Sequence, residues 1–342
     1  MPVNTMHGGN IYQFARRIGC LPEQVLDFSA NINPQQAVDW VSLRTVNLTP
    51  YADPDYSQLK QAFKQRYPYP ANADCEVFNG ASAAIFALLR FLRPRQLLLY
   101  APLYSEYVRM GRQLGCQLSF INRFDEDLDA VIPRGSTVVF VNPATPDGQL
   151  YDLHPLLLRW QQADCTIVID ESFLDFCLSE SAMESISQYD KLYVIKSLSK
   201  FYGCAGIRIG FVIAAVSAVN ALKQYEPSWK LSSLDMAYMQ QALVNTDFIA
   251  QTHQQTAILR QLLHQALCDS GLFEHVYPSA ANFLLARLPG NCDGHALQSA
   301  LESERILIRV CDNFIGLDQR HVRFAVKDQH TIEQLAYALA HV

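Results

Sequence analysis

The sequence predicts an α/β protein with a large, doubly wound, mostly parallel sheet domain and a smaller α+β domain. Short apolar runs alternate with helical stretches from about residue 75 to residue 215, which is the pattern of a sheet built from crossover units. The pattern changes after Pro227 to a long helical region followed by separate strands and helices. A length of 342 residues also exceeds the roughly 150 residues expected of one domain.

The apolar runs of the first region are the expected strands. Because they are apolar throughout, they suit strands that helices cover on both faces. The stretches between them place apolar residues at helical spacing and have Ser or Asp near their starts, as helix caps do. We therefore expect strands at 97–100, 137–141, 166–169, 192–195 and 207–213, and helices at 82–92, 105–114 and 153–162.

The rest of the chain predicts a smaller domain and an N-terminal segment. A helical region at 234–270 precedes the strand-like run NFLLARL, a helix at 296–304, the runs RILIRV and HVRFAVK, and a terminal helix. The first 40 residues hold a short helix and the extended run FSANINP, which we expect to lie over a neighbouring surface. We divide the chain into a segment at 1–40 that closes over the active site, a large α/β domain at 41–233 and a small α+β domain at 234–342.

Composition narrows the function classes. The net charge of −6 argues against general binding to nucleic acid or anionic membrane, both of which need clustered Lys and Arg. The nine cysteines include no CxxC pair and no His/Cys cluster at zinc spacing, so we expect no metal site and reduced thiols in the cytoplasm. The N-terminus lacks a signal-peptide layout, and no apolar run approaches the ~20 residues of a membrane span.

Polar residues that follow the predicted strands are the first candidates for chemistry, because ligands of open α/β sheets bind beyond the carboxyl ends of the strands. Asp170 directly follows the run TIVI, and Lys200 ends the KSLSK that follows LYVI. Taken singly, Asp170 reads as a helix cap or a structural ion pair, Lys200 as a solvated lysine and Arg208 as a surface charge. Their combination changes this interpretation.

The stretch SLSKFYGCAGIRIGF resembles the signature of fold-type-I pyridoxal-5′-phosphate enzymes, in which a Ser, a Lys three residues later and an Arg eight beyond it surround the cofactor. Ser197, Lys200 and Arg208 match this spacing, and IDES upstream matches the strand end that supplies an aspartate. The resemblance implies that Lys200 attaches the cofactor and acts as general acid and base, that Asp170 holds the pyridine nitrogen protonated, and that Ser197 and Arg208 bind the phosphate.

Three further segments match cofactor-binding segments of this class. The run FNGASAAIF leads into a helix, whose first N–H groups at Ala81 and Ser82 suit a phosphate. Tyr104 in APLYSEY matches the aromatic residue that stacks on the cofactor ring. Tyr51 in PYADPDY resembles the tyrosine that reaches the phosphate from the other subunit, which implies a homodimer with shared active sites. Without the resemblance, these residues would read as close packing, core and surface loop.

The chain departs from relatives that carry NPNNPTG, since it has NPATPDG. Thr145 stands where the relatives' Asn bonds the phenolic oxygen of the cofactor, and its hydroxyl can still donate. Asn142 is either a cofactor contact or a structural residue. Phe173 stands where many relatives have a tyrosine, so we expect that contact to be absent.

The ends of the chain resemble the family of L-threonine O-3-phosphate decarboxylases of cobalamin biosynthesis, most specifically in HGGN, SANINP and the tail RILIR…GLD…R. The resemblance implies a small phosphorylated amino-acid substrate and its decarboxylation to (R)-1-amino-2-propanol O-phosphate and CO₂. It assigns Arg323 to the substrate carboxylate or phosphate and Arg309 to a second anion contact. His7, Asn10 and Asn31 are the candidates for closing the site. All five of these residues also have a structural interpretation, because interdomain arginines and capping asparagines are equally common as structural residues.

Two rival functions stay open at this stage. Histidinol-phosphate aminotransferases are close relatives, and such an enzyme would need a 2-oxo acid such as 2-oxoglutarate. Lys327 replaces an arginine expected four residues beyond Arg323, which is expected to reshape phosphate recognition. The remote rival is a non-catalytic cofactor-binding regulatory protein, which the presence of both Asp170 and Lys200 disfavours.

Overall fold

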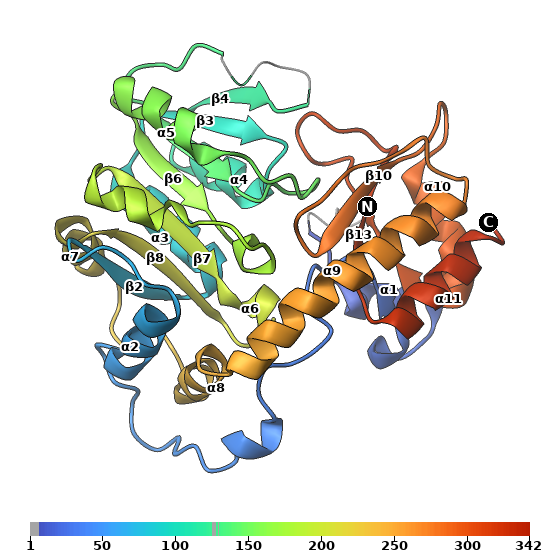
Figure 1. Ribbon diagram of the computed structural model, residues 1–342, viewed down its shortest axis with the longest axis horizontal. Helices are drawn as coiled ribbons and strands as arrows, with labels where there is room; N and C mark the ends of the chain where they lie inside the picture. Colours follow the sequence, from blue (N-terminus) through green and yellow to red (C-terminus); the bar gives the residue numbers. More distant parts are fainter. Residues whose placement is uncertain (1–6, 125–127, 129) are drawn as a thin grey trace.

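The computed structural model describes residues 7–124, 128 and 130–342 and arranges them in a large and a small sheet region (Figure 1). The large sheet has the strand order β2-β8-β7-β6-β5-β3-β4. Its strands are β2 (Ala73–Asn79), β3 (Gln96–Ala101), β4 (Gln117–Asn122), β5 (Thr137–Val141), β6 (Thr166–Asp170), β7 (Leu192–Ser197) and β8 (Ile209–Ala215).

Strands β3 to β7 pair in parallel, whereas β8 runs antiparallel to both β2 and β7. The connection from β7 to β8 holds only the four-residue helix α6 (Leu198–Phe201) and a loop, which is too short for the crossover that a parallel neighbour needs. All five expected strands are present. Strands β2 and β4 were not predicted, because their runs ADCEVFN and QLSFIN mix polar with apolar residues.

Helices cover both faces of this sheet, as the uniformly apolar strands require. One buried cluster joins α3, α4 and α7 to one set of strand side chains, and a second joins α2, α5 and α8 to the alternate set. The helices are α2 (Ser57–Arg66), α3 (Gly80–Leu92), α4 (Ser105–Gln113), α5 (Leu153–Gln162), α7 (Val216–Lys223) and α8 (Ser233–Leu243), and the short 3-10 turns are η2 (Trp40–Leu43), η3 (Leu174–Phe176) and η4 (Ala182–Ser187).

The helical region expected at 234–270 divides into two helices. It breaks at Val244, and Asn245 caps the second helix by accepting a hydrogen bond from the backbone N–H of Phe248. Helix α8 packs on α2 and β8 of the large region, while α9 (Thr246–Asp269) packs on β10 and α11 of the small one. This pair of helices therefore links the two regions (Figure 1).

The small region contains the antiparallel sheet β12-β13-β10-β9. The run RILIRV divides at Ile308 into two short strands that belong to different sheets. The elements are β9 (His275–Val276), β10 (Phe283–Arg287), α10 (Gly294–Ala300), η5 (Leu301–Glu304), β11 (Ile306–Leu307), β12 (Arg309–Val310), β13 (His321–Ala325) and α11 (Gln329–Leu339).

The N-terminal segment is part of the small region. Strand β1 (Leu26–Asp27) pairs in parallel with β11, and α1 (Ile11–Ile18) and η1 (Pro22–Gln24) precede it. Phe28 is fully buried in the core that β10, β13 and α11 form. The described part of this segment thus has paired and buried anchors, and the run that follows Phe28 reaches the cleft between the two regions. Within the described residues, no helix is long and apolar enough to span a membrane.

Candidate active site

A cleft of about 540 Å³ lies at the carboxyl ends of β5, β6 and β7, where the large sheet faces the small region. Val141, Asp170 and Ser197, the last residues of those strands, line it. The opposite wall comes from the small sheet and from the N-terminal segment. The following predicted residues line the cleft: His7, Asn31, Ala81, Ser82, Tyr104, Thr145, Asp170, Ser197, Lys200, Arg208, Arg309 and Arg323.

Lys200 lies in α6 with its ammonium group 4.8 Å from the centre of the Phe173 ring. Burial lowers the pKa of Lys200 to about 8; Asp170 opposes the shift, while Arg208 and Arg323 add to it. A large share of its side chains is therefore neutral near pH 8, which an amine needs to act as a nucleophile. Phe173 stands where many relatives have a tyrosine, and it presents an apolar ring to Lys200 in place of a hydroxyl group.

Asp170 is buried, and its two carboxylate oxygens have separate donors. Oδ2 accepts a hydrogen bond of 2.8 Å from the hydroxyl of Tyr107, and Oδ1 accepts one of 2.9 Å from the backbone N–H of Ser172. Burial, and then the charge of Asp170, raises the pKa of Tyr107 well above its ordinary value, so the hydroxyl remains a donor. These bonds hold the carboxylate in place and compensate for its lost solvation.

Sequence reasoning missed Tyr107. It lies in the first turn of α4, three residues after Tyr104, the residue that precedes this helix. APLYSEY carries this spacing, so the second tyrosine could have been proposed as a partner of a strand-end carboxylate. Its burial and its direction toward Asp170 depend on the packing of α4 against the sheet.

The start of α3 and Arg208 form a compact cradle beside Lys200. A side-chain carbon at Gly80 would lie 2.3 Å from Arg208 Nη2, and one at Gly210 would lie 2.5 Å from the backbone nitrogen of Ala81. Asn79, which precedes the helix, provides no side-chain cap, so the first N–H groups of a 13-residue helix remain available to an anion. Ser82 adds a hydroxyl, and Ser197 lines the same part of the cleft.

Tyr104 lines the cleft in the connection between β3 and α4. Its hydroxyl is 3.1 Å from Ser82 Oγ, and its ring centre is 5.2 Å from that of His7. His7 Nε2 in turn lies 2.8 Å from Glu106 Oε1. The N-terminal segment thus contacts α4 beside the predicted ring-stacking residue.

Thr145 and Asn142, both in the loop NPATPDG, have different roles. Thr145 lines the cleft, and its Oγ1 lies 3.3 Å from Arg323 Nη1, so its hydroxyl is shared with the small region. Asn142 is buried outside the described lining, where its amide bonds both the N–H and the carbonyl of Tyr151. Of the two interpretations of Asn142, the structure favours the structural one.

Arg309 and Arg323 are directly opposite each other on β12 and β13, and both line the cleft. Each is less than a tenth exposed. Burial lowers the pKa of Arg323 to about 10 and also lowers that of Arg309, so both still carry their charge at neutral pH. Arg323 Nη2 donates to the carbonyl of Ser29, while its buried Nε has no hydrogen-bond partner among the described residues.

The other two N-terminal candidates, Asn31 and Asn10, differ in whether they reach the cleft. Asn31 lines the cleft, and its buried Oδ1 has no hydrogen-bond partner among the residues described. Asn10 does not reach the lining, because its side chain caps α1 by accepting from the N–H of Gln13. Lys327 also lies outside the lining and donates to the carbonyl of Ala30 at 3.3 Å. The substitution at Lys327 therefore secures the N-terminal segment in this structure, and the expected contact of Asn10 with the site is not present.

Tyr51 lies outside the cleft of its own chain. It is 80% exposed, and its ring stacks on that of Trp229 with 4.8 Å between centres. This position leaves the tyrosine free to contact another molecule.

The residues of the cleft fit a phosphorylated aromatic cofactor. The cradle of α3 and Arg208 suits a phosphate, Tyr104 offers an aromatic face, and Asp170 is held where a ring nitrogen would need a carboxylate. Lys200 supplies an amine of lowered pKa. Among the residues the structure describes, no group of three His, Cys, Asp or Glu side chains could hold a metal ion.

Comparisons with known proteins agree with this geometry. Residues 23–342 match the family described as aminotransferase class I and II. The threonine-phosphate decarboxylase of Salmonella typhimurium is 31% identical over 359 residues, which covers 99% of this chain and 97% of that protein. Among solved structures, L-threonine-O-3-phosphate decarboxylase from Porphyromonas gingivalis has a TM-score of 0.79 and 24% identity, covering 91% of this chain and 97% of that one.

A second solved structure, histidinol-phosphate aminotransferase from Sinorhizobium meliloti in complex with pyridoxal-5′-phosphate, has a TM-score of 0.84 and 21% identity, covering 99% of this chain and 95% of that one. The architecture is that of the fold-type-I pyridoxal-phosphate enzymes, as the fold class predicted. The chain belongs to the aminotransferase class I and II family, and its predicted kinship with the threonine-phosphate decarboxylases and histidinol-phosphate aminotransferases is confirmed.

Proposed function

We propose that this protein is a cytoplasmic, pyridoxal-phosphate-dependent decarboxylase that converts O-phospho-L-threonine to (R)-1-amino-2-propanol O-phosphate and CO₂ in cobalamin biosynthesis. The proposal is supported by 31% identity to a threonine-phosphate decarboxylase over nearly the whole of both chains. Histidinol-phosphate aminotransferases match at lower identity, at 28% over 54% of this chain in one case and at 22% over 92% in another. The decarboxylase is therefore the first candidate and the aminotransferase the second.

The paired arginines are the structural observation that carries the substrate class. Like charges directly opposite each other on neighbouring strands repel, and here the repulsion acts in a buried place. An anion between Arg309 and Arg323 removes that cost, and a guanidinium fork matches both carboxylate and phosphate. A substrate with a carboxylate and a phosphate a few bonds apart supplies two such anions.

The cofactor would be held by residues at the ends of β6 and β7, in α6 and at the start of α3, together with Arg208 just before β8. Lys200 attaches it through Nζ, Arg208, Ser197 and the start of α3 bind its phosphate, and Asp170 keeps a proton on its ring nitrogen. When bound, pyridoxal phosphate accepts the electron pair left when the bond between Cα and the carboxylate breaks. Tyr107 and Ser172 orient Asp170 for this task through the hydrogen bonds described above.

The reaction also requires that the chain orient the substrate and return a proton. Arg323 and Arg309 hold the substrate anions so that the carboxylate bond, and not the Cα–H bond, is the one that breaks. The carboxyl carbon would leave as CO₂, and the amine of Lys200 would deliver a proton to Cα. His7 and Asn31 cover the cleft and limit the entry of water, which favours the charged contacts inside it.

The active form is proposed to be a homodimer. The exposed pair Tyr51 and Trp229 supports this, because large aromatic side chains with high exposure are typical of protein interfaces. In the dimer, Tyr51 would donate its hydroxyl to the cofactor phosphate in the partner's cleft, as the resemblance implies. All nine cysteines are unpaired, which accords with a reducing compartment.

The function is tested by incubating the cofactor-loaded protein with O-phospho-L-threonine and measuring CO₂, in parallel with histidinol phosphate plus 2-oxoglutarate and measuring glutamate. The decarboxylase releases CO₂ without any 2-oxo acid. Formation of glutamate without CO₂ would instead establish the aminotransferase. An Arg323→Met variant should lose activity with the true substrate while the cofactor remains bound, because the arginine contacts the substrate.

A further inference from the structure

A buried ion pair lies beside the cleft. It connects the loop that carries Tyr104 with the loop that carries Thr145. Arg123 follows β4, and Asp147 belongs to the loop between β5 and α5. Their side chains are 2% and 3% exposed, and Arg123 Nη1 lies 3.6 Å from Asp147 Oδ1. Neither side chain is among the described residues that line the cleft.

Arg123 also holds the backbone of both loops. Its Nη2 donates to the carbonyl of Pro102 and, at 3.4 Å, to the carbonyl of Thr145. Pro102 precedes Tyr104 by two residues, and Thr145 itself lines the cleft. One guanidinium group therefore ties the loop of Tyr104 to the loop of Thr145.

The loop of Asp147 also contacts the small region. Its Gly148 carbonyl accepts a hydrogen bond of 2.8 Å from the N–H of Ala280, and a side-chain carbon at Gly148 would lie 1.9 Å from Ser279 Oγ. Thr145 Oγ1 contacts Arg323 on the same side. A shift of this loop would therefore disturb a cofactor-side residue and a substrate-side arginine together.

Stability alone does not explain the pair. Burial raises the pKa of Asp147 even though Arg123 opposes the shift. Arg123 Nε and Nη1 and Asp147 Oδ1 have no hydrogen-bond partner among the described residues. Removing two charges from water costs more than a loosely bonded pair returns, and an apolar pair of similar volume would stabilise the fold as well or better. Asp147 stands where the motif NPNNPTG has a threonine.

We propose that Arg123 and Asp147 form a positioning pair, which fixes the separation of the loops that carry Tyr104 and Thr145 and thereby the shape of the cofactor site. The proposal rests on the proposed function only for the identity of the cofactor. It is independent of whether the substrate is phosphothreonine or histidinol phosphate. Cofactor binding, which needs no substrate, is therefore the proper readout.

The test compares the single variant Asp147→Asn with the double variant Arg123→Met/Asp147→Leu. The single variant leaves a buried charge unpaired, so both the unfolding temperature and the affinity for pyridoxal phosphate should fall. The double variant restores apolar packing but holds neither carbonyl. Its unfolding temperature should rise above that of the single variant, while its Kd for the cofactor stays about tenfold or more above wild type and the absorbance maximum of the bound cofactor remains shifted.

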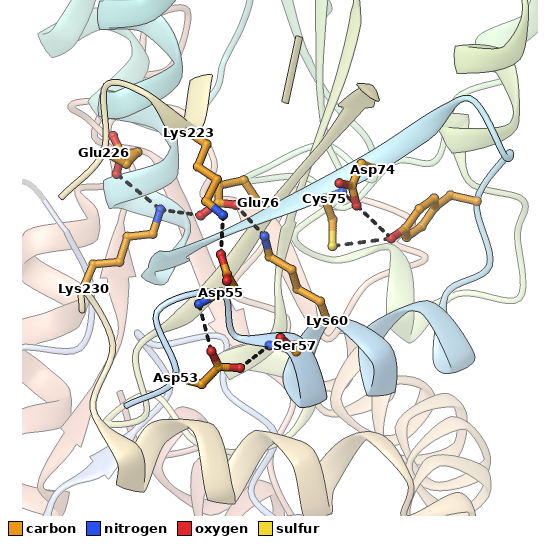
Figure 2. Close-up of polar contacts among 11 residues, drawn as sticks. Asp53, Asp55, Ser57, Lys60, Asp74, Cys75, Glu76, Lys223, Glu226 and Lys230 are labelled. Carbon is orange, nitrogen blue, oxygen red and sulfur yellow. Dashed lines mark hydrogen bonds and ion pairs between the residues drawn. The ribbon is translucent and has the colours of Figure 1, made fainter. Parts of the chain in front are cut away.

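Two further variants make the result specific. Glu76→Gln is the matched control, because Glu76 is an equally buried carboxylate that pairs with Lys60 at 2.6 Å and with Lys230 at 2.8 Å, outside the lining of the cleft (Figure 2). It should lower the unfolding temperature and leave cofactor affinity unchanged. Arg123→Lys keeps the charge but loses the guanidinium group, whose Nη2 reaches both carbonyls while Nη1 faces Asp147, so it should fold and bind the cofactor several-fold more weakly.

The proposal is overturned if the double variant recovers cofactor affinity and absorbance together with its unfolding temperature, since the pair would then only fill space. It is also overturned if Arg123→Lys binds the cofactor as tightly as wild type. Loss of CO₂ release with normal cofactor binding in these variants would contradict the positioning role as well. If phosphothreonine proves not to be the substrate, the cofactor measurements remain decisive.

Discussion

At the scale of residues, the cleft joins groups whose ordinary properties are altered by burial. The ammonium of Lys200 is buried over the Phe173 ring, and the carboxylate of Asp170 is held by Tyr107 and a backbone N–H. Lys200 therefore gives up its proton more readily than a solvated lysine, while Asp170 is fixed as an acceptor. These two changes suit an amine that must attack a carbonyl group and a carboxylate that must hold a ring proton.

The lowered pKa of Lys200 predicts how cofactor attachment depends on pH. Only the neutral amine attacks, and the neutral form dominates above the pKa, so the attachment rate should rise as pH increases and level off above about 8. A solvated lysine would keep rising toward 10.5. The measurement is the rate of absorbance change when pyridoxal phosphate is added to the apoprotein at a series of pH values. A rate that still climbs steeply well above pH 8 would contradict the electrostatic account of the cleft.

Tyr107 is predicted to contribute through Asp170. Removing its hydroxyl in Tyr107→Phe deletes a hydrogen bond to a buried carboxylate, which is worth about 1.5–3 kcal/mol, so kcat should fall roughly tenfold to a hundredfold. Lys200 should still attach the cofactor, but the pH at which the bound cofactor changes its absorbance should shift. The control is Tyr238→Phe, which removes the bond from a buried tyrosine to the carbonyl of Tyr202. Equal losses in both variants would show that Tyr107 acts only through stability.

At the scale of elements, the start of α3 and the ends of the parallel strands build the site. Sequence patterns predicted these strands and α3, because uniformly apolar runs and helical spacing are strong local signals. Asp170, Lys200 and Arg208 could be proposed from strand ends and motif spacing. The placement of Asn10, Asn142 and Lys327 could not, since capping an adjacent helix, bracing a loop and anchoring the N-terminal segment depend on neighbours that only the folded chain provides.

The cradle at α3 gives a prediction for glycine. Gly80 has a φ of +80°, and a side-chain carbon there would lie 2.3 Å from Arg208 Nη2. Gly80→Ala should therefore displace the guanidinium and raise the Kd for pyridoxal phosphate about tenfold or more. Gly115→Ala is the control, because Gly115 has a similar φ of +70° with open space around it. It should lose a comparable amount of stability, about 1 kcal/mol, and keep its cofactor affinity. Equal cofactor affinities in the two variants would argue against the cradle.

At the scale of the whole molecule, the cleft is closed by parts of the chain that are far apart in sequence. The N-terminal segment is anchored by β1 and by Arg323 and Lys327, and the small sheet supplies Arg309 and Arg323 to the lining of the cleft. The sequence indicated a second domain and a closing segment, but the pairing of β1 with β11 could not be read from two-residue strands. Tyr51 lies outside the cleft of its own chain and is the candidate for a further phosphate donor from the partner.

Sharing of sites across a dimer predicts complementation between variants. Tyr51→Ala and Lys200→Ala each damage a different contribution to one cleft, so homodimers of either variant should be weakly active or inactive. Refolding an equal mixture should produce heterodimers with one intact cleft, and activity should recover to roughly a quarter of wild type if the chains associate at random. CO₂ release from the mixture and from each variant alone provides the comparison. No recovery, with dimers present by sedimentation, would contradict the shared site.

The most direct test of the decarboxylase is the fate of the hydrogen on Cα. We would supply O-phospho-L-threonine with deuterium at Cα, without any 2-oxo acid, and analyse the products by mass spectrometry. The account predicts one CO₂ for each substrate consumed and a 1-amino-2-propanol phosphate that retains the deuterium, because the carboxylate bond breaks and the Cα–H bond does not. Loss of the deuterium with the carboxylate retained would show that the Cα–H bond breaks and would contradict the account.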